Sequence, residues 1–245
     1  MTNTITILPD ETTFDTVAAD RIVAQIKSKV DSVIGLSTGR TTGNMHRLVA
    51  DRWKQERFDV SRLTLFGLDE VTGVDREYAG ACYKMLRTEI ADGMNLGEEQ
   101  LLMLPTRSDD FDRDCHAFCQ MLDEKGGADL LILGLGENGH LGFNQPGSDF
   151  ASGCRTTRMH AELEVRIRRE TATPDDVPLG GITLGVKDIM HMRRIILVAK
   201  GKNKAEAVKQ MLHGPVTSDF PASILQLHNN CEFLLDAEAA SLILR

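Results

Sequence analysis

The sequence predicts a single Rossmann-like α/β domain, in which helices cover both faces of a mainly parallel sheet. Three observations carry this prediction. Short apolar runs typical of buried strands alternate along the chain with stretches of helical spacing. Several apolar runs end in glycine-rich or polar turns, and open α/β sheets bind ligands at that end of their strands. No linker or internal repeat divides the 245 residues, so we expect residues 1–245 to form one domain.

Helices are predicted where apolar residues recur three or four positions apart. The first predicted helix contains Phe14, Val17, Ala18, Ile22, Val23, Ile26 and Val30. Further helices are expected over residues 43–55, 79–90, 111–124, 202–212 and 237–243.

Strands are predicted where short runs of apolar and β-branched residues occur. These runs cover residues 32–36, 63–68, 101–104, 130–135, 182–184, 194–199, 223–227 and 232–235. A polar, arginine-rich stretch over 155–169 and a proline-containing loop up to Pro178 interrupt the alternation. No helix or strand is assigned to these two segments.

Composition and charge restrict the partners. The formal net charge of −8 argues against nucleic acid and anionic membranes, so we expect a small-molecule ligand that a local basic or amide site must hold. No apolar run approaches the roughly 20 residues of a membrane span, and the N-terminus lacks the features of a leader. We therefore expect a cytoplasmic protein.

The cysteines indicate reduced thiols and no metal site. The five cysteines are scattered and have no paired C-x-x-C spacing. They are Cys82, Cys115, Cys119, Cys154 and Cys231. Cys115, His116 and Cys119 lie together on a predicted helix, which a helix face with buried small residues explains more simply than a metal site does.

A hydroxyl- and glycine-rich turn follows the first predicted buried strand and opens a helix. It consists of Ser37, Thr38, Gly39, Arg40 and Thr41. Backbone N–H groups at such a turn, aided by the helix N-terminus, form a cradle for phosphate. An ordinary helix N-cap is the alternative interpretation, and the turn lacks the spacing and the lysine of a Walker loop.

Two further strand ends carry titratable groups. Asp69 and Glu70 directly follow an apolar run, which makes Asp69 a candidate general base; an acidic turn is the alternative. The strand over 130–135 leads into a glycine-rich turn that contains His140. A histidine whose neighbouring glycines admit a ligand is suited to move a proton near neutral pH, although it can also serve only to bond a loop carbonyl.

Polar and basic residues around these groups complete the candidate site. Gly136, Asn138 and Gln145 belong to the histidine loop. Arg168, Arg169 or Lys204 can supply the positive charge that a phosphate needs, and spacing alone does not choose between the two arginines.

Taken together, four segments resemble the glucosamine-6-phosphate deaminase/isomerase family. They are Gly-Leu-x-Thr-Gly near position 38, Leu-Asp-Glu at 68–70, Gly-Leu-Gly-x-Asn-Gly-His-Leu-Gly-Phe-Asn-x-Pro-Gly at 134–147, and GKNKAEAVKQMLHG followed by FPASILQLH. The similarity covers essentially the whole chain in the same order. GITLGVKDIM at 181–190 and Gly80-Ala81-Cys82 resemble the galactosamine-6-phosphate branch most closely.

The resemblance implies a reaction without metal or other cofactor, in which the sugar ring opens, the aldose becomes a ketose and ammonia leaves. Asp69 matches the base that moves a proton between C2 and C1. His140, with Asn138 and Gln145 beside it, matches the ring-opening acid/base. The phosphate loop matches residues 37–41, with Gly136, Arg169 and Lys204 as further substrate-binding positions.

The chain departs from the family pattern beside the histidine. Many members have an aspartate and a glutamate where this chain has Asn138 and Gln145. A neutral amide preserves the shape of a glutamate but not its charge, so His140 is expected to be a weaker acid/base. Water can assist His140, another carboxylate such as Glu70 or Glu137 can substitute, or the reaction itself has changed.

Three other functions compete with the deaminase. A 6-phosphogluconolactonase-like hydrolase shares the Gly-His pattern and needs no equivalent glutamate. A sugar-phosphate sensor of a transcriptional regulator would require a DNA-binding module, for which the sequence offers no room. A catalytically impaired sugar-phosphate-binding protein is the third. Because the chain ends soon after its last predicted helix, without the extension of the family's allosteric hexamers, we expect a monomer or homodimer.

Overall fold

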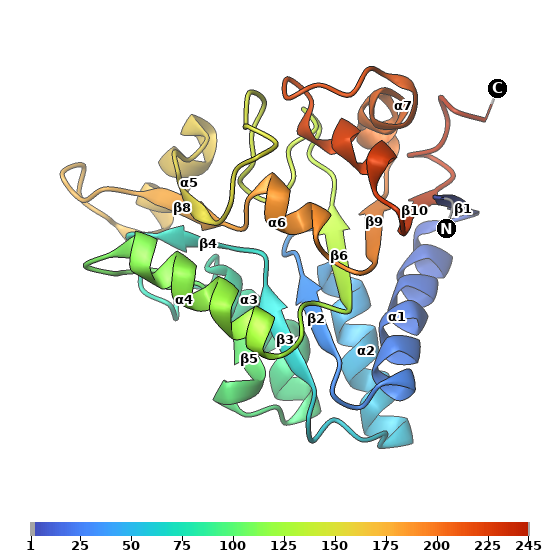
Figure 1. The fold of residues 1–245 in the computed structure, drawn as a ribbon, viewed down its shortest axis with the longest axis horizontal. Coiled ribbons are helices and arrows are strands. Elements are labelled where there is room, and N and C mark those ends of the chain that lie inside the picture. The colour runs from blue at the N-terminus through green and yellow to red at the C-terminus, as the bar shows by residue number, and fades with distance from the viewer. Residues whose placement is uncertain (1–2, 245) are drawn as a thin grey trace.

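A seven-stranded sheet forms the centre of the molecule, which the computed structural model describes for residues 3–244 (Figure 1). Every strand pair in it is parallel, and the order is β1-β10-β9-β6-β2-β3-β5. The strands are β1 (Thr4–Leu8), β2 (Val33–Leu36), β3 (Thr64–Gly67), β5 (Leu101–Leu102), β6 (Leu130–Gly134), β9 (Ile195–Ala199) and β10 (Cys231–Asp236). The predicted parallel α/β architecture is confirmed.

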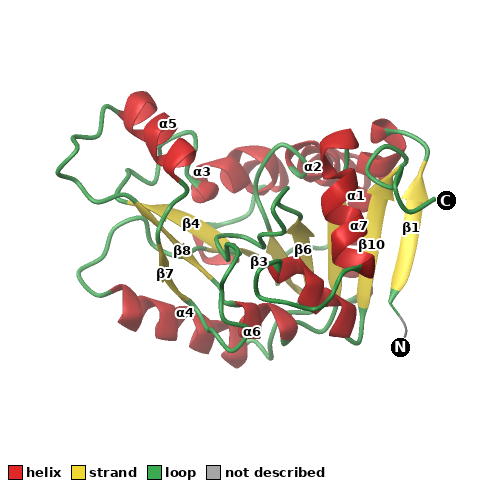
Figure 2. Ribbon diagram, turned by 90° about the horizontal axis from the view of Figure 1, so that it is seen from above, coloured by secondary structure: helices red, strands yellow, loops and turns green. Residues whose placement is uncertain are grey.

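Helices cover both faces of this sheet, as Figure 2 shows for α2 and α3 on one side and α4 and α6 on the other. One layer consists of α1 (Glu11–Ser28), α2 (Gly43–Glu56) and the short α3 (Cys82–Leu86). The opposite layer consists of α4 (Phe111–Glu124), α6 (Val186–Met190) and α7 (Ala205–His213). No helix within residues 3–244 is both long and apolar enough to span a bilayer.

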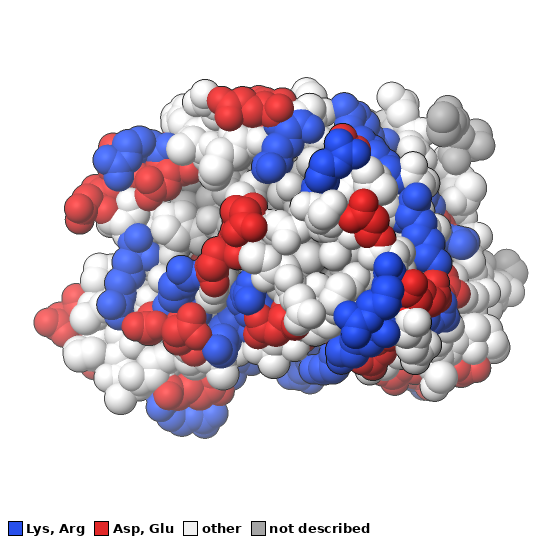
Figure 3. Space-filling view, turned by 90° about the horizontal axis from the view of Figure 1, so that it is seen from below, with Lys and Arg blue, Asp and Glu red and all other residues white. Residues whose placement is uncertain are grey.

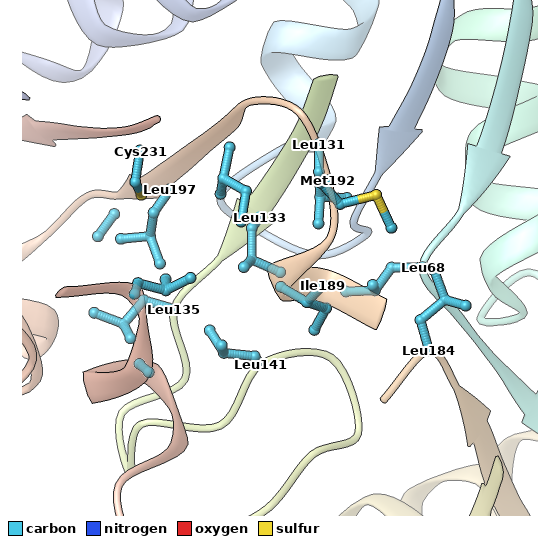
Figure 4. Packing of buried hydrophobic residues seen from close by; sticks show 14 of the residues in the cluster. Leu68, Leu131, Leu133, Leu135, Leu141, Leu184, Ile189, Met192, Leu197 and Cys231 are labelled. Atoms are coloured by element: carbon cyan, nitrogen blue, oxygen red, sulfur yellow. The ribbon is translucent and has the colours of Figure 1, made fainter. Parts of the chain in front are cut away.

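Strand alternation divides the core between these two layers. On β6, Leu130 and Ile132 pack against α1 and α2, whereas Leu131 and Leu133 face α4 and α7. Figure 4 shows the second group with Leu197, Ile189 and other apolar neighbours. Burying each such side chain contributes about 1.5–3 kcal/mol, which explains why the central strands read as continuous apolar runs.

A second, smaller sheet lies next to the first and contains part of the candidate site. Its order is β4-β8-β7, with both pairs antiparallel, formed by β4 (Asp69–Thr72), β8 (Gly180–Thr183) and β7 (Arg155–Thr157). In its register Thr183 pairs with Asp69 on one side and with Arg155 on the other. The sequence analysis did not predict this sheet.

Several predicted elements are wrong. Residues 223–227 are not a strand but part of a 3-10 helix over Pro221–Leu227, because Pro221 opens a helical turn and Ser223 bonds Thr217 instead of a neighbouring strand. Residues 237–243 form turns instead of the predicted helix. The side chain of Asp236 accepts a hydrogen bond from Ala239 N–H, and no regular helix follows this bond. The stretch over 155–169 contains β7 and most of α5 (Ala161–Thr171).

The boundaries of other elements also differ from prediction. The helix expected over 79–90 begins only at Cys82 and passes into a π-helical turn over Arg87–Ala91. Strand β1 was not predicted at all and lies at the edge of the sheet, with β10 as its single partner.

Acidic and basic side chains lie intermixed on the face of the molecule seen in Figure 3. Many charged groups of the protein are paired, as in Lys27–Glu56 and Arg193–Asp129. Pairs between two exposed side chains contribute only about 0–1 kcal/mol each and affect solubility more than stability. Asp129 differs, since its largely buried carboxylate pairs with both Arg193 and Lys29.

Candidate active site

Four neighbouring strands deliver the candidate residues to one edge of the sheet. In the order β9-β6-β2-β3, the segments that follow these strands contain Lys204, His140, the loop over 37–41 and Asp69. All four strands are parallel, so their carboxyl ends lie side by side. A ligand at this edge can contact all four segments.

Asp69 is a buried carboxylate at the start of β4, with a relative exposure of 9%. Burial, followed by the negative charge of Glu70, raises the pKa of Asp69 to about 7, against a weaker opposing effect of the hydrogen bond from Cys82. Gly142 of the histidine loop packs against the carboxylate, since a Cβ at position 142 would lie 3.0 Å from Asp69 Oδ2. A carboxylate with a pKa near neutrality is suited to accept and return a proton.

Glu70 is a structural anchor and not a free carboxylate. Its Oε1 accepts from Val71 N–H at 2.8 Å and Cys82 N–H at 2.7 Å, and its Oε2 accepts from Tyr83 N–H at 2.7 Å. It therefore holds the first turn of α3 against β4. The side chain is fully buried and directed to α3, so the hypothesis that Glu70 substitutes for the missing glutamate beside His140 is wrong.

The anchored helix places a thiol beside the candidate base. Cys82 Sγ lies 3.7 Å from Asp69 Oδ1, and Thr38 Oγ1 donates to the same sulfur at 3.2 Å. Burial, then the charge of Asp69, raises the pKa of Cys82 well above its usual range. The sulfur thus remains a protonated thiol that donates to Asp69.

His140 is oriented by two amide side chains. Its Nδ1 lies 2.6 Å from Asn138 Oδ1, and Asn138 Nδ2 donates to Gln145 Oε1 at 3.1 Å. Because an amide oxygen only accepts, the Nδ1 atom of His140 carries the proton and Nε2 is free to exchange one with a ligand. Gly136 lies under the ring and donates its N–H to the carbonyl of His140 at 3.0 Å, so it supports His140 directly.

Electrostatics favour the neutral form of His140. Burial, followed by the positive charges of Lys204 and His160, lowers its pKa, and only Glu137 acts in the opposite direction. Glu137 Oε1 is held by Asn203 Nδ2 at 2.7 Å, next to Lys204. Glu137 thus affects His140 through its charge, and within residues 3–244 no hydrogen bond joins the two side chains.

The loop over residues 37–41 can bind an anion. Ser37 is used internally, because its Oγ accepts from Gly134 N–H at 3.0 Å and joins β2 to β6. The four following N–H groups, of residues 38–41, find no acceptor within residues 3–244 and lie at the surface just before α2. Free N–H groups in sequence at the start of a helix attract phosphate.

Lys204 supplies a cation at the same edge. Burial lowers the pKa of Lys204 against the opposing charge of Glu137, and the positive charge of Arg40 lowers it further, so the two cations lie near each other. The turn that presents Lys204 is fixed where Asp236 accepts from Gly201 N–H at 3.1 and 3.0 Å. Two neighbouring cations repel each other until an anion lies between them, which favours phosphate binding.

The two arginines of α5 differ in their contacts. Arg168 donates to Glu164 Oε1 and to the carbonyls of Pro174 and Val177, and so connects α5 to the loop that follows it. Arg169 is exposed and has no hydrogen bond or ion pair within residues 3–244. Arg169 is thus the arginine free for a ligand, although none of its described contacts joins it to the phosphate loop.

Cys82 and Asn203 were missed as site residues by the sequence analysis. Cys82 reaches Asp69 only because α3 folds back onto β4. Asn203 lies beside a predicted lysine, but its bond to Glu137 spans 66 positions of sequence.

The fold and the site together define an α/β enzyme whose sheet edge can hold a small anion beside two groups suited to exchange protons. The chain belongs to the family described as glucosamine-6-phosphate isomerases/6-phosphogluconolactonase, whose model matches residues 9–233.

Individual relatives agree with this assignment. The chain is 35% identical over 224 residues to a glucosamine-6-phosphate deaminase of Clostridium botulinum (strain Loch Maree / Type A3), covering 91% of this chain and 92% of the relative. It is 32% identical over 226 residues to a glucosamine-6-phosphate deaminase of Thermoanaerobacter sp. (strain X514), covering 92% and 89%.

Solved structures agree as well. A monomeric glucosamine-6-phosphate deaminase superposes with a TM-score of 0.89 at 30% identity, covering 98% of this chain and 99% of that one. The 6-phosphogluconolactonase of Trypanosoma brucei superposes with a TM-score of 0.78 at 20% identity, covering 98% of each chain, which shows a shared fold.

Proposed function

We propose that this protein is a hexosamine-6-phosphate deaminase/isomerase, which converts the amino sugar phosphate and water into a ketohexose 6-phosphate and ammonia. One observation carries the proposal most directly. Asp69 is a buried carboxylate with a pKa of about 7 that shares a sheet edge with His140 and a phosphate-binding loop. The deaminase relatives at 30–35% identity support the same activity.

His140 starts the reaction by opening the sugar ring. Its free Nε2 takes the proton of the C1 hydroxyl and returns a proton to the ring oxygen, so the ring C–O bond breaks and an aldehyde forms at C1. Asn138 keeps the other nitrogen protonated throughout. The lowered pKa of His140 ensures that the ring is neutral, and therefore able to accept a proton, at neutral pH.

Asp69 then moves a proton within the open chain. Its carboxylate takes the proton from C2 and returns it to C1, while O1 gains a proton and the amino nitrogen loses one, which turns the 2-amino aldose into a 1-hydroxy-2-imine. Water adds to this imine carbon and the C–N bond breaks, so that ammonia leaves and a ketone remains at C2. The free N–H groups of residues 38–41 and the side chain of Lys204 hold the phosphate and fix the sugar relative to Asp69.

A 6-phosphogluconolactonase is the second candidate function. The amide Gln145 beside the histidine favours it, because lactone hydrolysis needs no carboxylate at that position. Against it stands the buried base Asp69, since hydrolysis of a lactone moves no carbon-bound proton.

One set of assays separates the two activities. Purified protein is mixed with glucosamine 6-phosphate, galactosamine 6-phosphate or 6-phosphogluconolactone, and ammonia, ketose phosphate and acid release are measured. The deaminase proposal predicts ammonia and ketose phosphate in equal amounts from an amino sugar. Acid release from the lactone without ammonia from either amino sugar would contradict it.

The finer part of the proposal concerns the sugar epimer, the oligomeric state of the protein and its compartment. Glucosamine 6-phosphate is the first substrate to test because the relatives carry that name, with galactosamine 6-phosphate as the comparison suggested by residues 181–190. We expect a monomer or homodimer in the cytoplasm, and the monomeric structural relative supports the smaller state. Light scattering on the purified protein measures this directly.

A further inference from the structure

Three thiols meet on the side of the molecule formed by α4. Cys115 and Cys119 lie one turn apart on α4 and therefore share a face of the helix. Cys154, immediately before β7, lines the same cavity as these two cysteines. Helix α4 packs directly on β7, so this arrangement is part of the regular packing of the fold.

Two of the three thiols, those of Cys119 and Cys154, are accessible to a small reagent, whereas Cys115 is buried beside them. They line a cavity of about 650 Å³, whose rim includes Lys187 and Asp188. Cys119 and Cys154 are only partly buried, whereas Cys82 and Cys231 are buried elsewhere in the fold. A dissolved oxidant can therefore reach this cluster before the other two cysteines.

The contacts also activate two of the thiols. The proximity of Cys154 lowers the pKa of both Cys115 and Cys119, while these two raise the pKa of Cys154. The charge of Lys187 favours the thiolate of Cys119, against Asp188 and Asp123. The thiolate is the form that attacks a disulfide, so Cys115 and Cys119 are the nucleophiles of the cluster.

A metal does not fit this group of residues. Within residues 3–244, no three His, Cys, Asp or Glu side chains are arranged to hold a metal ion, and the cluster is included in that statement. Thiols that line one cavity from two packed elements have a second use, which is to form a disulfide.

We propose that Cys115, Cys119 and Cys154 form a reversible disulfide site, in which Cys154 bonds to either of the two helix cysteines. The oxidant is a small-molecule disulfide such as oxidised glutathione. One protein thiolate attacks it, forms a mixed disulfide and releases one reduced thiol. A second protein thiolate then displaces the other small thiol, so that two protein S–H groups are lost, one protein S–S bond forms and the oxidant is reduced to two thiols.

The disulfide would connect two parts of the fold that are distant in sequence, since it would join α4 to the segment that precedes β7. In the smaller sheet, Arg155 of β7 pairs with Thr183 of β8, and Thr183 pairs with Asp69 of β4. The site is thus separate from the proposed active site but bonded to the sheet that carries its base.

The test treats the native, folded protein with oxidised glutathione and then counts free thiols and maps disulfides by mass spectrometry of a non-reduced digest. We expect two of the five thiols to be lost, with Cys154 linked to Cys115 or Cys119, and reduction to restore all five. Retention of all five thiols, stable glutathione adducts without an internal bond, or a bond that includes Cys82 or Cys231 would overturn the proposal.

Three serine variants sharpen the test because Cys154 is the shared partner. Cys115→Ser and Cys119→Ser should each still form one disulfide, through the remaining helix cysteine. Cys154→Ser should form none, since two cysteines one turn apart on an intact helix are poorly oriented for a bond. Equal oxidation of Cys154→Ser and wild type, with circular dichroism showing both folded, would contradict the assigned role of Cys154.

Discussion

Cys82 Sγ lies 3.7 Å from Asp69 Oδ1, in a chain of contacts that begins at Thr38 in the phosphate loop. The proposed base is therefore linked to the proposed phosphate site through a single thiol. A protonated thiol that donates to a carboxylate stabilises its charged form and lowers its pKa, and this effect opposes the burial of Asp69.

Loss of this thiol should change the pH dependence of turnover. In the wild type, kcat/KM should rise as pH passes through about 7, because Asp69 must be ionised to take a proton. In Cys82→Ala the rise should move to higher pH, with a roughly two- to five-fold loss of activity below pH 7, the amount expected for one modest hydrogen bond. The control Cys82→Ser retains a donor and should keep the wild-type midpoint. Identical pH profiles for all three proteins would exclude Cys82 as a positioning residue.

Asp69 should also reduce the stability of the protein as pH rises. Its pKa is about 7 in the folded state and 3.8 in an unfolded chain, so the folded protein holds a proton that the unfolded chain has lost between these limits. Stability must therefore fall as pH increases from about 4 to about 7. Asp69→Asn removes this dependence, and its advantage over wild type should grow by about 3 kcal/mol between pH 5 and pH 8.

Thermal or denaturant unfolding of the two proteins at pH 5 and pH 8 measures this effect. A constant difference between them at both pH values would show that the carboxylate of Asp69 ionises normally in the folded protein.

The substitution Gln145→Glu should raise activity on the amino sugar. Gln145 Oε1 already accepts from Asn138 Nδ2, and a glutamate oxygen can accept the same bond. The new negative charge would raise the pKa of His140 and make it a stronger base for the C1 hydroxyl proton, with a gain of roughly two- to ten-fold in kcat. Gln145→Ala, which loses the bond, is the control and should be slower than wild type. A slower Gln145→Glu enzyme would indicate that the glutamine is adapted to a different substrate.

Substitutions of the two arginines of α5 should have different effects, one on substrate binding and the other on the thermal stability of the protein. Arg169→Ala should raise KM by roughly ten-fold and weaken inhibition by inorganic phosphate, since a charge-assisted hydrogen bond contributes about 1.5–3 kcal/mol. Arg168→Ala should instead lower Tm with little change in KM, because Arg168 holds α5 to the carbonyls of Pro174 and Val177. The opposite pattern would assign the phosphate contact to Arg168.

The sequence was sufficient to predict the central sheet because its inner strands are buried on both faces and appear as short apolar runs. It was insufficient at β1, an edge strand whose residues are mostly exposed and alternate with threonines. Helix α5 was missed for a related reason, since Ile167 is its only fully buried residue and no apolar face marks it. Hydrophobic periodicity predicts an element only where burial makes the pattern strong.

Some residues of the candidate site could likewise be predicted from the sequence, and others could not. Asp69 could be found because it directly follows an apolar run, and His140 because it lies in the glycine-rich turn after the apolar run over 130–135. The roles of Glu70 and Cys82 could not, because they depend on bonds between β4 and the start of α3 that no local pattern reveals. Contacts of this kind depend on how a loop brings two distant segments together. The spacing of residues in one sequence does not predict this.

The amounts of ammonia and ketose phosphate formed from glucosamine 6-phosphate by wild type and Asp69→Asn, measured side by side, test the central claim most directly. The account predicts equal amounts of both products from the wild type. It also predicts a loss of roughly 10²–10⁴-fold in the variant, with inorganic phosphate bound within a few-fold of wild-type affinity. Near-normal turnover by Asp69→Asn, or no ammonia from folded wild-type protein with either amino sugar, would contradict it.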